Sequence, residues 1–180
     1  MGLVLVGEDG VVTMTKITRR AVLRAGGAAA ILSTPTAVAA NPNNPGPPVQ
    51  GSGKGLITGL EIIPIREVGG NSFEERILTG TATGTLEGTF VQDTQGVVHK
   101  SGRVVFDGTM TFTGQVGDCG EGTLTLSVSG RGHVPEPGFP ITEASVRVIN
   151  QAANTVDVTG TGTVFQEGPF LTYVIEYVCR

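Results

Sequence analysis

The chain has few of the residue types from which catalytic and metal sites are built. Its 180 residues include only 2 His and 2 Cys, and no serine lies in a G-x-S-x-G nucleophile motif. His99 lies beside a predicted turn and His133 in a predicted loop, without the spaced carboxylates of a metal site. The cysteines lack the C-x-x-C spacing of a redox dithiol. We therefore name no catalytic or metal-binding residue and expect no cofactor.

Long apolar segments are also missing. The stretch 25–40 is the most membrane-like part of the chain, but it contains Pro35 and many alanines. It is too short and too weakly apolar to form a stable spanning helix. We therefore expect no membrane span in the mature protein.

The N-terminal region contains the three parts of an export signal in order. A basic stretch at 18–24 (TRRAVLR) precedes an apolar stretch at 25–32 and small residues at 36–40 (TAVAA). The pair Arg19 and Arg20, followed closely by Leu23, resembles a twin-arginine translocation signal. The alternative is a basic tail on a soluble protein, and the ordered succession of parts favours export.

This interpretation divides the chain into three parts. Residues 1–40 are the predicted signal, cleaved after Ala39 or after Ala40, and Met14 offers a second start. Residues 41–55, rich in Pro, Gly and Asn, are expected to form a disordered linker, and 56–180 to form one domain. The predicted partner is the twin-arginine translocation machinery, and the predicted location is the cell envelope or the medium.

The mature chain is acidic. From Asn41 onward it has 8 Lys and Arg against 14 Asp and Glu, a net charge of −6. Such a surface repels the phosphates of nucleic acids. We expect no nucleic-acid partner.

Cys119 and Cys179 are the two cysteines. In an oxidising compartment, an even number of cysteines predicts a disulfide. The alternative is two unpaired thiols. A disulfide would tie the last predicted strand to a loop in the middle of the domain.

The domain alternates apolar and polar residues with a period of two. The pattern is clear at 103–113, 123–129, 143–148 and 155–164, and no helical stripe follows Leu56. Segments 56–68 and 170–179 are more continuously apolar, as expected of strands covered on both sides. Glycines recur inside strand sequence, which favours sharply coiled strands. We predict an all-β domain of about eight strands in a small closed antiparallel barrel.

At these glycines the sequence resembles the allene-oxide-cyclase-like barrels. The similarity lies in GTLEGTF at 84–90 and DGTMTFTG at 107–114, continued by GTLTL at 122–126 and VTGTGTVF at 158–165. It covers 79–177 and implies the same barrel. Many bacterial members of that group have no known function. The plant cyclases bind an oily epoxide in the barrel, but no residue of this chain matches their site.

Three functions remain open. The first is a barrel that binds a small apolar molecule or an envelope partner, with a cavity lined by Phe106, Met110, Phe112 and Tyr173. The second is a cyclase or isomerase, which needs a carboxylate inside the barrel. The run Glu74-Glu75-Arg76, and Glu61 with Arg66, could be paired carboxylates or ion pairs, and we favour exposed strand charges. The third is a structural envelope protein with a solid core.

Overall fold

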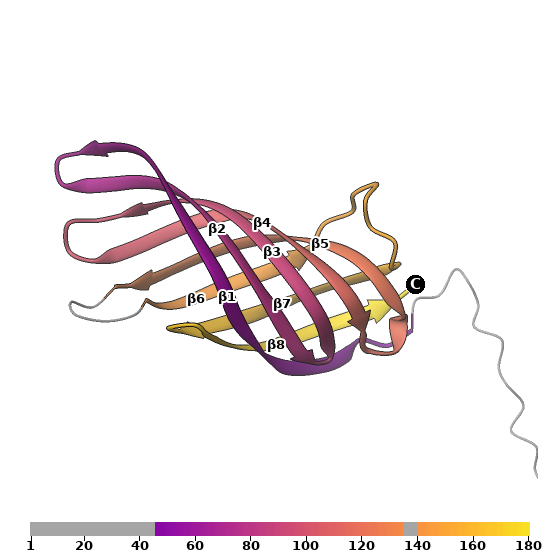
Figure 1. The fold of residues 1–180 in the computed structure, drawn as a ribbon. Helices are drawn as coiled ribbons and strands as arrows, with labels where there is room; N and C mark the ends of the chain where they lie inside the picture. The colour runs from indigo at the N-terminus through magenta and orange to yellow at the C-terminus, as the bar shows by residue number, and fades with distance from the viewer. Residues whose placement is uncertain (1–45, 135–139) are drawn as a thin grey trace, which may run out of the picture. The chain divides into compact units, whose positions relative to one another are not determined.

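The computed structural model describes residues 46–134 and 140–180, which form a closed antiparallel β-barrel (Figure 1). Each strand pairs with the next along the chain, and β1 pairs with β8 to close the barrel. The prediction of an all-β closed antiparallel barrel of about eight strands is confirmed. The elements are β1 (Val49–Val68), β2 (Asn71–Gly84), β3 (Leu86–Val98), β4 (Arg103–Val116), the 3-10 turn η1 (Gly117–Cys119), β5 (Glu121–His133), β6 (Ile141–Val148), β7 (Val158–Glu167) and β8 (Phe170–Cys179).

The two-residue alternation determines which side chains enter the barrel. In β4, Val104, Phe112 and Val116 point inward and are each only 1% exposed, whereas the intervening Thr109 and Thr111 point outward to solvent. The same alternation runs through the neighbouring strands, so the inward side chains meet in one core.

The two ends of the barrel differ in their connections. One end holds η1, the short β2–β3 turn and the C-terminus of β8. The other end holds the β1–β2 turn, where Gly69 and Gly70 have φ of 60° and 78°. A two-residue hairpin with positive φ at both positions matches the strand twist, and glycine adopts it without steric cost. We call this second end the hairpin end.

A disulfide joins Cys119 of η1 to Cys179 at the end of β8, with their Cα atoms 5.2 Å apart. The predicted pairing of the two cysteines is confirmed. The bond links two segments that are 60 residues apart in sequence, at the end of the barrel opposite the hairpin end.

The predicted boundary between linker and barrel is wrong. Residues 49–55 are the first part of β1, and they pair with β8 from Val49 opposite Tyr177 to Gly55 opposite Leu171. Gly53 explains why this glycine-rich stretch belongs to the sheet. A Cβ there would collide with the Thr83 carbonyl and the Tyr173 hydroxyl, so glycine permits close packing.

The expectation that both apolar segments are covered on two sides is also wrong. In β1, Leu60 is 55% exposed and Ile65 is 52% exposed, because β1 projects beyond the end of β8 and, within the described residues, pairs there only with β2 (Figure 1). In β8, Phe170 and Val174 face outward and are exposed. The continuous apolar runs at 56–68 and 170–179 therefore include side chains that face outward and are exposed to solvent.

The predicted signal, including Arg19 and Arg20, and residues 41–45 of the predicted linker lie outside the described residues. In the part of the chain that the structure describes, we find no helix with the length and apolar character needed to cross a membrane.

Candidate ligand-binding cavity

The barrel interior contains a largely apolar cavity with a volume of about 60 Å³. One water needs roughly 10–15 Å³ of such space, so the cavity has room for a small group of atoms. Side chains from all eight strands line it, and most of them are aliphatic or aromatic. A cavity of this kind favours an apolar occupant.

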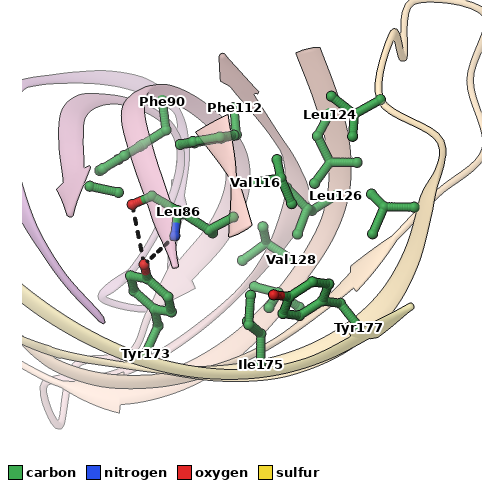
Figure 2. Packing of buried hydrophobic residues seen from close by; sticks show 14 of the residues in the cluster. Leu86, Phe90, Phe112, Val116, Leu124, Leu126, Val128, Tyr173, Ile175 and Tyr177 are labelled. Carbon is green, nitrogen blue, oxygen red and sulfur yellow. Dashed lines mark hydrogen bonds between the residues drawn. The ribbon is translucent and has the colours of Figure 1, made fainter. Parts of the chain in front are cut away.

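The structure brings the four predicted lining residues together. Phe106, Met110 and Phe112 enter from β4 and Tyr173 enters from β8, and all four line the same cavity. Phe112 and Tyr173 belong to the buried core (Figure 2). Phe106 and Met110 are partly buried against it.

The Tyr173 hydroxyl is held by the backbone of two neighbouring strands. It accepts a hydrogen bond from the Leu86 N–H at 2.7 Å (Figure 2). Its own proton can be donated to the Thr83 carbonyl at 3.0 Å or to the Leu86 carbonyl at 3.2 Å. These contacts bridge β8 to the β2–β3 turn over Gly53 of the intervening β1. Tyr173 therefore fixes the cavity wall, and its hydroxyl is not free to bind a ligand.

Burial raises the pKa of Tyr173 above its usual value of 10.0, and the Leu86 N–H partly opposes this shift. The neutral phenol is therefore favoured in the folded state. The resulting stability is fully present below pH 10 and is lost as the pH rises through the folded-state pKa.

We expect Tyr173→Phe to lower the free energy of unfolding by about 1–3 kcal/mol, because the buried Leu86 N–H loses its acceptor. Urea unfolding at neutral pH measures this change. The loss of stability above pH 10 should also be smaller in the variant than in the wild type. An identical pH dependence in both proteins would contradict the role assigned to this hydroxyl.

Three polar side chains interrupt the apolar lining of the cavity. Gln92, Thr142 and Gln166 contribute to its lining, and the Thr142 hydroxyl donates to Oε1 of Gln166 at 3.1 Å. The Gln166 amide in turn donates to the Gly168 carbonyl at 2.9 Å. Amides and hydroxyls at this position could accept or donate to one polar atom of an otherwise apolar ligand.

The preferred interpretation of Glu74 and Arg76 as exposed strand charges is wrong. Glu74 is 7% exposed, and Arg76 forms an ion pair with it, its Nε donating to Oε1 at 2.6 Å. Both lie on the inward face of β2, the face of Leu78 and Ala82, toward the hairpin end. The sequence could have placed Glu74 and Arg76 inside, because they share even numbering with Leu78 and Ala82. However, Phe73 and Ile77 made the odd-numbered face look equally apolar.

The interior is therefore suited to binding more clearly than to chemistry. Among the described residues, the hydroxyl with a shifted pKa is bound to backbone groups, and the buried carboxylate, Glu74, is paired with Arg76. Among the described residues, no group of three or more His, Cys, Asp or Glu side chains could hold a metal ion. The sequence matches no protein-family model and no curated protein.

Proposed function

We propose that this protein is an exported barrel that binds a small apolar molecule in its interior. The observation that carries the proposal is the cavity of about 60 Å³, lined by Phe106, Met110, Phe112 and Tyr173. Closed eight-stranded barrels hold either packed side chains or one small ligand, and an unfilled apolar space is consistent with the second. The resemblance to allene-oxide-cyclase-like barrels, proposed from the Gly-Thr pattern, supports a barrel of this kind but carries over no ligand-binding residue.

Export is the second part of the proposal. It is supported by the ordered signal at 18–40 and by the Cys119–Cys179 disulfide, because structural disulfides are typical of oxidising compartments. The translocation machinery would be the partner of the signal.

Replacing Arg19 and Arg20 together by Lys should keep the protein in the cytoplasm, because a twin-arginine signal requires both guanidinium groups. Cell fractionation and blotting measure the distribution. A matched Lys16→Arg change leaves the pair intact and should be exported normally. Unchanged export of the double variant would refute this route.

Native mass spectrometry of the protein from its own host tests for a retained ligand, and xenon tests the cavity directly. Under xenon pressure, we expect the methyl NMR signals of Ala82, Leu86 and Val146, which line the cavity, to shift. Ala82→Leu should abolish these shifts. Ala82 lines the cavity, so the added atoms of leucine enter the cavity space itself.

The control is Thr81→Leu, the same added side chain on the outward face of β2. It should leave the xenon response unchanged. A wild-type protein with no retained ligand and no xenon shift would identify a solid barrel and favour a structural envelope function.

The second candidate is an enzyme of the cyclase or isomerase type. The inward Glu74 favours it, since such an enzyme needs a carboxylate inside the barrel. Glu74→Gln separates the two candidates. If the variant retains the same compound as the wild type, the protein binds that compound without converting it. If the variant instead retains a different compound, the unconverted substrate, the protein is an enzyme.

A further inference from the structure

Within residues 46–134 and 140–180, the projecting half of β1 leaves a strand edge without a partner. The pairing of β1 with β8 ends at Leu56 opposite Phe170, and the Ile57 N–H then donates to the Pro169 carbonyl at 2.8 Å. From Thr58 to Val68, β1 pairs with β2 alone among the described residues. An unpaired edge of this length can template the addition of another strand.

The register shows which backbone groups point to this edge. The Ile57 N–H points away from β2, and Ile57 lies opposite Gly80. Leu60, Ile62, Pro64 and Glu67 also lie opposite even-numbered residues of β2, so their backbone groups point the same way. Pro64 has no N–H to leave unpaired there, and proline in sheets is confined to such edges.

The outward face of the same segment has self-complementary charges. Glu61, Ile63 and Arg66 lie opposite Ile77, Glu75 and Phe73, so they are successive residues on the outer face, with Ile65 accommodated in an irregularity of the register. All three are exposed. If two copies of the chain paired about a twofold axis at Ile63, Glu61 of each copy would lie opposite Arg66 of the other. The contact would therefore contain two opposite-charge pairs.

We propose that the free edge of β1 pairs antiparallel with the same edge of a second copy of this chain, about a twofold axis at Ile63. Ile62 of each copy then donates its N–H to the Pro64 carbonyl of the other, and Leu60 and Glu67 exchange backbone hydrogen bonds. The apolar side chains at this edge, Leu60, Ile62 and Ile63, lose solvent exposure in the contact. Other registers place Glu61 or Arg66 opposite an apolar residue or a like charge, so the charges select this one.

Charge reversal tests the proposal on the full chain. Sedimentation velocity should give a dimer for the wild type, and Glu61→Arg and Arg66→Glu should each raise the dimer dissociation constant about tenfold or more, because each places like charges in contact. The double variant E61R/R66E restores opposite charges and should dimerise like the wild type. Glu87→Arg, an equivalent reversal on the outward face of β3, should have no effect.

Circular dichroism confirms that each variant is folded, which matters for Arg66→Glu because Arg66 lies 4.3 Å from the Phe73 ring centroid. If that variant fails to fold, Glu61→Arg and amide exchange still decide the question. The amides of Leu60, Ile62 and Glu67 should exchange more slowly at concentrations that favour the dimer. A monomeric wild type, a dimer insensitive to both reversals, or a double variant that stays monomeric would each overturn the proposal.

Discussion

Removal of the Cys119–Cys179 disulfide is expected to lower the free energy of unfolding by about 4 kcal/mol. The bond closes a loop of 60 residues, and cross-linking a loop of that length reduces the conformational entropy of the unfolded chain by this amount. Typical domains have only about 5–15 kcal/mol of stability, so the loss is a large part of the total. Guanidinium unfolding of the Cys119→Ala/Cys179→Ala variant measures it.

Reductant provides the control for this prediction. It should destabilise the wild type to the level of the double variant and leave the double variant unchanged. A reduced wild type as stable as the oxidised protein would show that the bond contributes nothing to folding.

Phe112→Ala is the second change with a large expected effect, about 3–5 kcal/mol of lost stability. The Phe112 side chain is 1% exposed and packs in the core between β3 and β5 (Figure 2). Its truncation removes buried apolar area and enlarges the cavity that it lines. Urea unfolding with fluorescence or circular dichroism detection measures the change.

The adjacent Thr111 is the matched control, because it lies on the same strand and faces solvent. Thr111→Ala should change stability by no more than about 0.5 kcal/mol. Equal effects of the two substitutions would mean that the inward and outward faces of β4 are assigned incorrectly.

Much of the fold could be predicted because strand periodicity is a local property. Alternation at 103–113 assigns Phe106, Met110 and Phe112 to one face without any knowledge of the partner strands. In β8, where both parities are apolar, the structure decides that Tyr173 faces inward and Val174 outward. Parity was therefore sufficient for the cavity residues of β4, and the structure supplied the cavity that they share with Tyr173.

The errors occurred where parity was ambiguous or where the partner strand decided the outcome. Residues 49–55 resemble a linker by composition, and only pairing with β8 places them in the sheet. Glu74 and Arg76 looked exposed because Phe73 and Ile77 gave the opposite face an equal claim to the core. The register with β1 and β3 resolves this ambiguity, and those strands are distant in sequence.

The sequence by itself determined the strand content and the inward residues of β4, and it favoured the pairing of its two cysteines. These depend on side-chain alternation and residue count, which are local or compositional. The tertiary structure decided the unpaired edge of β1, the buried Glu74–Arg76 pair and the volume left inside the barrel. Each of these depends on how far one strand extends past its neighbour, and strand pairing sets that distance between residues far apart in the chain.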